Sequence, residues 1–174
     1  MTEPDDFERR AAERVVELGN NDHPIDLGTF AAMFDLFRVS ARVVGDLESE
    51  VHRPLGLSIA GFRVLFTVWV FDSLEVREIA RLSGVSRAAV SGVVTTLEKE
   101  GLACRNRDHD DGRLVSVTAT PAGVEMLRMA YQAQNVREGD LFAALSPAEL
   151  DRFTGLLRKI LNTEAPEDSR SADH

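Results

Sequence analysis

The sequence predicts a mainly α-helical protein that carries one small β-hairpin, and three observations lead to this prediction. Apolar residues recur at three- and four-residue steps through most of the 174 residues. Residues 75–100 read as a helix, a tight turn and a second helix. Two short segments, 102–107 and 113–120, then read as strands, the second with alternating side chains, and the polar stretch between them contains a glycine, which is typical of a hairpin.

Two helices are expected at the start of the chain. Residues 7–19 have helical apolar spacing, and Gly19 is a plausible stop. After the breaker at 20–24, a long amphipathic helix is expected from Leu27 to about Val51, ended by Pro54 and Gly56. The first of these helices, 7–19, is a short extra helix at the N-terminus.

A third helix is expected from Ile59 to Phe71. Ser58 directly precedes it and is a good N-cap residue. Because this segment is apolar almost all round, we expect it to be buried.

Residues that begin and end helices mark the bounds of the helix, turn and helix. The first helix covers 75–83, Gly84 opens the turn, Ser86 caps the second helix, and Gly101 stops that helix. The hairpin that follows is the candidate wing. Together these elements predict a winged helix-turn-helix lobe.

Two further helices are expected after the hairpin. Pro121 suits the first turn of a helix that runs to about Ala144. Ser146 and Glu149 form a capping box for the final helix. The tail from Ala165 has the composition of a disordered segment.

The apolar stripes of the terminal helices exceed what one small lobe can bury, so a symmetric homodimer is the simplest expectation; packing within one chain is the alternative. The stripes are Phe30, Phe34 and Phe37 in one helix and Leu150, Phe153, Leu157 and Ile160 in the other. The expected organisation is an N-terminal extension with a short extra helix (1–24), a helical dimerisation region (25–53 and 121–162), the winged helix-turn-helix DNA-binding lobe (54–120) and a disordered tail (163–174).

Charge and composition limit the function classes. The formal net charge is −9, but residues 1–76 carry −7, residues 77–117 carry +1 and residues 118–174 carry −3. Only the middle segment could therefore offer a local positive surface to a phosphate backbone. The single cysteine, Cys104, excludes an internal disulfide and a multi-thiolate metal site. No membrane span or secretion signal is seen, so we expect a cytoplasmic protein.

The second helix of the pair has a clear buried face and a clear outward face. Val90, Val93, Val94 and Leu97 recur at helical spacing and are expected to be buried. The outward residues are then small or hydrogen-bonding, which lets a helix sit deep in a major groove; an ordinary solvated face is the alternative. These residues are Arg87, Ala88, Ser91, Gly92, Thr95 and Lys99.

Arginines flank the hairpin tip. Arg105, Arg107 and Arg113 could approach the adjacent minor groove, where narrow A·T tracts concentrate negative potential. One of the tip aspartates is expected to orient Arg113 by a bidentate hydrogen bond. For Arg105, nearer the start of its strand, a surface ion pair is as good an interpretation as a DNA contact.

The segment from the second helix through the hairpin resembles the signature of the MarR family of bacterial regulators, and the similarity extends over 27–162. The matching pieces are Leu97-Glu98, Gly101, Asp111-Gly112-Arg113, Leu114 to Val117 and Thr120-Pro121-Ala122-Gly123. The resemblance implies a dimeric winged-helix fold, an inverted-repeat operator and usually release by a small ligand. It also implies recognition-helix and wing contacts for Ser86, Ser91 and Arg113.

The sequence departs from the family pattern at two places. Gly92 stands where the family often has a basic residue or Asn, so one contact to DNA is expected to be missing. The extra N-terminal helix resembles the urate-responsive branch, but Phe62-Arg63 stands in place of its Trp-Asp, which disfavours urate.

A ligand site is expected around Arg63, a cation on an otherwise apolar helix that needs a partner. The partner is an acidic side chain, or the carboxylate of an aromatic effector held between Phe62, Phe66 and Trp69 in a cavity between the dimer helices and the lobe. His52 and Arg38 are weaker candidates, since a histidine near a helix end is more often a cap or surface group. A redox role for Cys104 is a lesser hypothesis beside simple packing.

These observations predict a transcription regulator, in the first place a repressor, that binds a pseudo-palindromic operator in double-stranded DNA as a homodimer. No metal, cofactor or catalytic residue is expected, because the four histidines are scattered and neither a glycine-rich phosphate loop nor a nucleophile motif is present. The alternative is a winged-helix protein-interaction module that does not bind DNA specifically, which the acidic balance favours.

Overall fold

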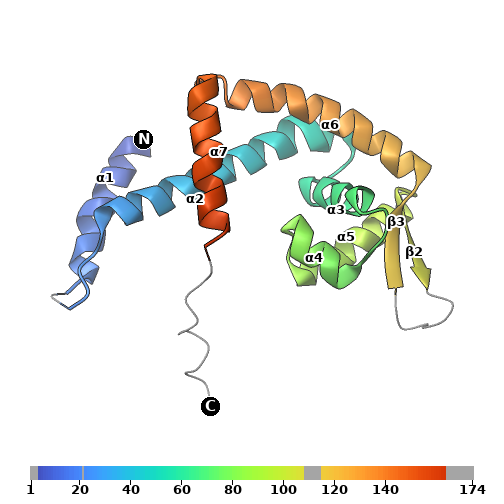
Figure 1. The fold of residues 1–174 in the computed structure, drawn as a ribbon, viewed down its shortest axis with the longest axis horizontal. Coiled ribbons are helices and arrows are strands. Elements are labelled where there is room, and N and C mark those ends of the chain that lie inside the picture. Colours follow the sequence, from blue (N-terminus) through green and yellow to red (C-terminus); the bar gives the residue numbers. More distant parts are fainter. Residues whose placement is uncertain (1–3, 21, 108–114, 164–174) are drawn as a thin grey trace, which may run out of the picture. The chain divides into compact units, whose positions relative to one another are not determined.

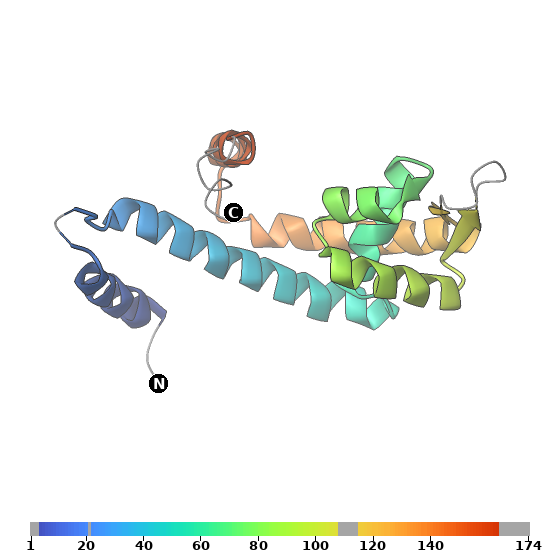
Figure 2. The same cartoon turned by 90° about the horizontal axis from the view of Figure 1, so that it is seen from below.

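The structure is a computed structural model, and it describes residues 4–20, 22–107 and 115–163. The chain divides into two compact units, Met1–Ala133 and Gln134–His174, which are taken in turn below. Figures 1 and 2 show the order of the elements along the chain. The segment predicted to be a disordered tail from Ala165 lies outside the described residues.

The two helices predicted at the start of the chain are confirmed. Helix α1 spans Pro4–Val15 and continues as a 3-10 turn, Val16–Leu18, up to Gly19. Helix α2 spans Leu27–Leu47, and the Asp26 side chain caps it by accepting from the backbone N–H groups of Gly28 and Thr29. The two helices pack together, with the rings of Phe7 and Phe34 5.7 Å apart.

The end of the long helix is less regular than its sequence suggests. After Leu47 the chain forms a π-helical turn, Glu48–His52, and a 3-10 turn, Arg53–Leu55. Gly56 then reverses the chain with a φ of 75°, a conformation that favours glycine. In the wider turn both Val51 and His52 are buried.

Among the described residues, no single helix is both long and apolar enough to cross a membrane. The segments 27–55 and 59–70 pass that test only when taken together, with a bend of 79° between them.

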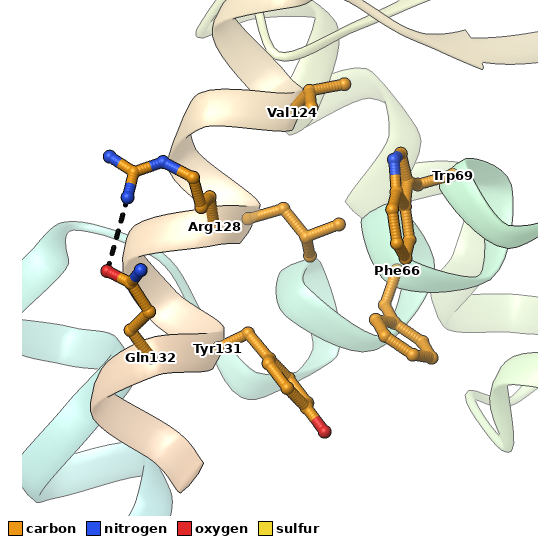
Figure 3. A pocket seen from close by; sticks show the side chains of 7 residues that line it. Phe66, Trp69, Val124, Arg128, Tyr131 and Gln132 are labelled. Atoms are coloured by element: carbon orange, nitrogen blue, oxygen red, sulfur yellow. Dashed lines mark hydrogen bonds between the residues drawn. The ribbon is translucent and has the colours of Figure 1, made fainter. Parts of the chain in front are cut away.

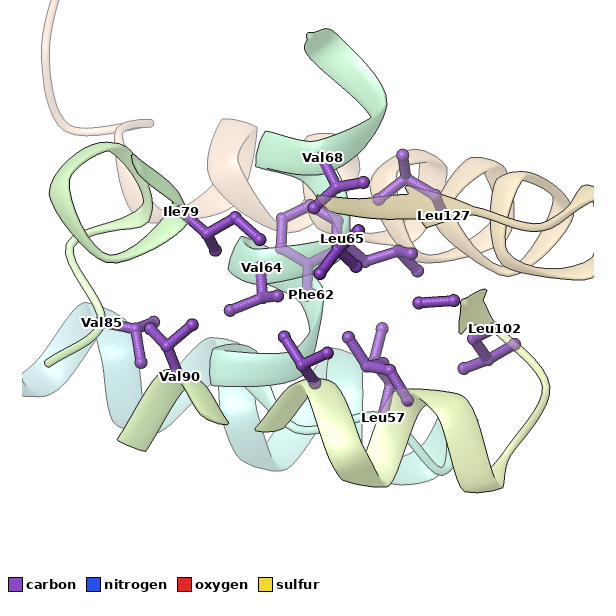
Figure 4. Close-up of a cluster of buried hydrophobic side chains, with 14 of the residues drawn as sticks. Leu57, Phe62, Val64, Leu65, Val68, Ile79, Val85, Val90, Leu102 and Leu127 are labelled. Atoms are coloured by element: carbon purple, nitrogen blue, oxygen red, sulfur yellow. The ribbon is translucent and has the colours of Figure 1, made fainter. Parts of the chain in front are cut away.

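Helix α3 (Ile59–Val70) forms the centre of the lobe, and Ser58 caps it through a bond from the Gly61 N–H of 2.9 Å. Val64, Leu65 and Val68 are fully buried against α4, α5 and strand β3 (Figure 4). The prediction that this segment is buried all round is wrong at its last turn. About half of the side chains of Trp69, Val70 and Phe71 is exposed, because the neighbouring elements do not cover that end of the helix.

The helix-turn-helix and the wing follow the predicted order. Helices α4 (Val76–Ser83) and α5 (Arg87–Lys99) are joined by a turn at Gly84. Strands β2 (Ala103–Arg107) and β3 (Val115–Ala119) pair antiparallel, with Arg105 opposite Val117. A third strand, β1 (Leu74–Glu75), pairs with the other edge of β3 and was not predicted, because two residues are too few to show alternation.

Helix α6 (Pro121–Leu141) begins against the lobe, where Leu127 and Ala130 belong to its core. Gly123 is required at this contact, because a Cβ there would lie 2.0 Å from the Leu102 carbonyl oxygen. The Thr120 hydroxyl donates to the Gly101 carbonyl at 2.6 Å and accepts from the Gly123 N–H. The Thr-Pro-x-Gly motif therefore fixes where α6 leaves the sheet.

In the second unit, helix α7 (Pro147–Leu161) has the predicted capping box of Ser146 and Glu149. The loop before it packs on the helix, with the rings of Phe142 and Phe153 6.3 Å apart. Large apolar side chains at the C-terminal end of α7 are exposed.

Candidate nucleic-acid interface

The turn between α4 and α5 is held by three local devices. Gly84 adopts a φ of 66°, and the buried Ser83 hydroxyl accepts the Val85 N–H at 3.2 Å. Ser86 then caps α5 by accepting the Ala89 N–H at 3.3 Å. Val85 and Val90, which stand one position before the Ser86 cap and four positions after it, are both buried and belong to one core cluster (Figure 4). Two apolar residues at this spacing form a hydrophobic staple, which fixes the angle at which the chain enters α5.

The outward face of α5 is as the apolar spacing predicts. Val90, Val94 and Leu97 are fully buried, and Val93 is half-buried. The other face is exposed and carries small, polar and basic side chains, namely Arg87, Ala88, Ser91, Gly92, Thr95 and Lys99. A Cβ added at Gly92 would have no neighbour within 4 Å, so a side chain at this position would point into open space.

Two arginines that sequence reasoning missed join this face at its N-terminal end. Arg77 and Arg81 of α4 line one hollow of about 330 Å³ together with Ser86 and Arg87. Arg77 pairs with Glu75 at 2.9 Å, and Arg81 pairs with Glu78 at 2.7 Å. Both arginines are exposed, so a phosphate can compete for these guanidinium groups. Their spacing of four residues on one helix is the signal that could have found them.

The two arginines nearest the hairpin tip lie at the limit of the described chain. The backbone of Arg107 pairs with Val115 at the last position of the β2–β3 ladder. The Arg107 side chain lies outside what the structure describes, as do Arg113 and the aspartates of the tip. Their contacts to DNA and the expected aspartate–Arg113 bond stay predictions.

Arg105 forms the ion pair that one of its two interpretations predicts. The Glu98 side chain accepts from both the backbone N–H and the guanidinium of Arg105. The second guanidinium nitrogen donates to the Ser91 carbonyl and to the Thr95 hydroxyl, each at 3.2 Å. Arg105 is thus an ion-paired residue that ties β2 to two turns of α5.

Cys104, next to Arg105, is exposed on the β2–β3 hairpin. Its sulfur lies 3.0 Å from the Thr118 hydroxyl on the paired strand. This contact fits a small residue that packs on the sheet, and the redox hypothesis stays untested.

A cavity of about 590 Å³ lies between α3 and the first part of α6 (Figure 3). Phe66 and Trp69 form one wall, and Tyr131 faces Phe66 with its ring centroid at 6.1 Å. The remaining lining residues come from α6 and are Val124, Leu127, Arg128 and Gln132. The basic side chain in this cavity is therefore Arg128, not Arg63.

Arg63 lines a second, smaller hollow of about 280 Å³ between α3 and α4, together with Phe62 and Val70. Phe66 is a wall of both hollows. The Arg63 side chain is exposed and lies over Gly84, so water solvates its charge and the expected need for a buried partner does not arise. The four residues predicted to share one ligand site are thus divided between two hollows.

The two weaker ligand candidates have internal roles in this structure. His52 is fully buried, with its ring centroid 4.6 Å from that of Phe62, so it is not a surface group. Arg38 bonds to Glu8 of α1 at 3.1 Å and lies over the Phe34 ring. Arg38 therefore holds the extra N-terminal helix against α2.

Comparison with known proteins decides the family. The profile described as "MarR family" matches residues 57–115, which run from the start of α3 into the wing. The HTH-type transcriptional regulator YwaE of Bacillus subtilis is 35% identical over 136 residues, which are 78% of this chain and 80% of YwaE. The chain belongs to the MarR family.

Two further MarR-like relatives carry informative names. The HTH-type transcriptional repressor YetL of Bacillus subtilis is 26% identical over 137 residues, 76% of this chain and 80% of YetL. The structure of Bordetella bronchiseptica BpsR, described with regulation of its DNA binding by 6-hydroxynicotinic acid, superposes with a TM-score of 0.71. The identity to BpsR is 25%, over 76% of this chain and 99% of that one.

The MarR assignment makes this chain a transcription regulator with a winged helix-turn-helix fold. Family membership fits the geometry of α5, which offers an exposed polar face between the arginines of α4 and the wing strand.

Proposed function

We propose that this MarR-family regulator is a cytoplasmic repressor that binds a pseudo-palindromic DNA operator as a homodimer and is released by a small aromatic ligand. The observation that carries the proposal is the outward face of α5. Its small and polar residues let the helix enter a major groove, while Arg77, Arg81 and Arg87 gather where the phosphate backbone would pass. The name of YetL supports the repressor role.

In this proposal Ser86, Arg87, Ala88, Ser91 and Thr95 meet the major groove, and Arg107 and Arg113 of the wing reach the adjacent minor groove. Segment 54–120 is the DNA-binding lobe, and segments 25–53 and 121–162 join two copies. The exposed apolar side chains of α2 and α7 support this division, because single chains rarely leave so many uncovered. Two-fold symmetry would place the recognition helices about 34 Å apart, one turn of DNA.

The α3–α6 cavity is the better place for the ligand. Its volume suits a small molecule, its walls are mainly aromatic and aliphatic, and Arg128 offers a charge for a carboxylate. Arg128 now bonds to Glu125 and Gln132, and both Arg128 and Glu125 are exposed enough for a ligand to compete. DNA binding of BpsR is regulated by 6-hydroxynicotinic acid, an aromatic acid of this chemistry. Arg63, with Phe62, keeps the smaller hollow as a second candidate.

Footprinting on the DNA upstream of the gene, with the ligand tested by titrating small aromatic acids, examines the proposal directly. Protection of a symmetric site that the acid relieves is the expected result. A ligand acts only through its different affinity for the bound and free dimer, so unchanged operator affinity with every acid would remove the ligand from the proposal.

The second candidate function is a winged-helix module that binds another protein, and the net charge of −9 favours it. The salt dependence of DNA binding separates the two. A fall of several log units in affinity per log unit of salt indicates phosphate contacts, whereas no slope or no binding indicates a protein partner.

A further inference from the structure

The hydroxyl of Thr95, at the middle of the outward face of α5, is already engaged within the chain. It donates its proton to the Ser91 carbonyl at 2.9 Å. It also accepts an N–H from the Arg105 guanidinium at 3.2 Å, while the first nitrogen of that guanidinium is bonded to Glu98. A hydroxyl has one proton and two lone pairs, so Thr95 has no proton left to donate and one lone pair left to accept.

This arrangement limits what the hydroxyl can do in a major groove. Phosphate oxygens and the N7 and O6 edge of guanine are acceptors only, and a hydroxyl without a free proton cannot bond to them. The Thr95 methyl group forms no hydrogen bonds, and Thr95 is exposed, so this group is free to make an apolar contact. Threonine methyl groups make apolar contacts with the C5-methyl group of thymine.

We propose that Thr95 reads the C5-methyl group of a thymine by apolar contact, and that Arg105 acts as a positioning residue which keeps the Thr95 hydroxyl turned away from DNA. This proposal rests on the proposed function, since it needs α5 in a major groove. The Arg105 guanidinium, two-thirds or more covered and bridged to Glu98, is held where it meets both Ser91 and Thr95.

Thr96 offers a matched control on the same helix. Its hydroxyl also donates back along the helix, to the Gly92 carbonyl at 3.1 Å, and the residue is exposed. Thr96 lines the groove between α5 and the start of α3, beside Leu57 and Ser58, and so lies off the Arg87–Ser91–Thr95 line. The same substitution at Thr95 and at Thr96 therefore removes or keeps the same groups, but on two different faces of α5.

The test uses a duplex that the full-length wild-type protein selects from a random-sequence pool. Each thymine of the selected site is replaced in turn by deoxyuridine, which removes only the C5-methyl group. Wild type is expected to lose about fourfold in affinity at one thymine of each half-site, the worth of one buried methyl group. Thr95→Val, which keeps the methyl group, should retain that discrimination. Thr95→Ser should bind the thymine duplex about fourfold more weakly and no longer distinguish it from the uracil duplex.

Thr96→Val and Thr96→Ser should leave the thymine-to-uracil ratio unchanged. The inference is overturned if no thymine is discriminated, or if Thr95→Ser keeps the wild-type affinity while Thr95→Val loses it, because the hydroxyl would then make the contact. If the wild-type protein selects no duplex from the pool, the proposed function fails and this inference fails with it. The outcomes above, in which a duplex is selected, overturn the inference alone.

Discussion

The winged helix-turn-helix lobe buries its large apolar side chains, whereas the terminal helices leave many of theirs exposed. In the lobe, Val64, Leu65, Ile79 and Val90 are completely buried by their own chain. On α2, 67% of Phe37 is exposed, and on α7 the exposed fractions of Ile160 and Leu161 are 61% and 81%. The core of the lobe is thus covered within one chain, and Leu127 and Ala130 of α6 take part in it. The terminal helices carry apolar surface that one chain leaves uncovered, which is the strongest reason to expect a second copy.

The largest effect is expected where the lobe core is broken. Leu65→Ala should lower the free energy of unfolding by about 2–5 kcal/mol, because the side chain is fully buried and leaves a cavity. Denaturant unfolding measures this loss. The control is Leu18→Ala at a side chain 81% exposed, with an expected change of about 0.5 kcal/mol or less. Equal losses for both variants would contradict the assignment of Leu65 to the core.

The next effect concerns the terminal helices. Phe37→Glu should weaken self-association by about 2 kcal/mol or more, because it places a charge in the centre of the expected interface. The dimer dissociation constant should then rise about thirtyfold, as measured by sedimentation equilibrium. Phe37→Met keeps an apolar side chain and should retain most of the affinity. A monomeric wild type would refute the idea that α2 meets a second copy.

On the DNA-binding face, Arg87→Ala should weaken operator binding by about 1–3 kcal/mol if Arg87 meets a base, and lower the salt slope by about 1 if it meets a phosphate. Fluorescence anisotropy over a range of salt concentrations distinguishes the two. Arg14→Ala removes an exposed arginine of α1, far along the sequence from the lobe, and should change neither quantity. An unchanged affinity for Arg87→Ala would place the DNA elsewhere.

A smaller effect is expected at the exposed Gly92. Gly92→Ala should raise the free energy of unfolding by about 0.8–1 kcal/mol, since alanine is the better helix former and its Cβ meets nothing. Thermal unfolding measures the gain. Gly123→Ala makes the same substitution where the Cβ would strike the Leu102 carbonyl and should destabilise the protein. A gain at both glycines would show that the α6 contact gives way.

The smallest effect is a pH dependence of the α7 cap. Hydrogen bonds from the Ser146 hydroxyl and backbone N–H hold the pKa of Glu149 below its usual value. Because the folded-state pKa is lowered, the cap stabilises α7 at neutral pH, and that stabilisation is lost as the pH falls through the folded-state pKa. Ser146→Ala should move the pKa of Glu149 back up, as followed by NMR titration. An unmoved pKa would assign the shift to another cause.

Sequence pattern predicted the fold best where polar and apolar residues alternate at the helical period. On α5, Val90, Val94 and Leu97 marked one face, and the opposite face was thereby assigned correctly. The same reasoning failed on α3, which is apolar almost all round and so gave no sign that Trp69 and Phe71 are left half-exposed. Strand β1 was missed because its two residues owe their place to pairing with Val117 and Ser116, far along the chain.

The candidate site shows the same division. Helical spacing was enough to choose Arg87, Ser91 and Thr95, since that choice depends on residues within four positions of one another. The ligand site was predicted around Arg63 because Arg63 is the cation of α3. The larger cavity, however, is completed by Arg128 and Tyr131 of α6, more than fifty residues away.

By itself the sequence determined the family, the order of helices and strands, the caps at Ser58, Ser86 and Ser146, and the outward face of α5, because these follow from periodicity, capping chemistry and local motifs. Only the tertiary structure decided that the Thr95 hydroxyl is engaged by Arg105, that Arg77 and Arg81 join Arg87, and that Arg63 and Trp69 line different hollows. The physical reason is that these features depend on which side chains from distant segments meet, and no spacing along one helix specifies its partners.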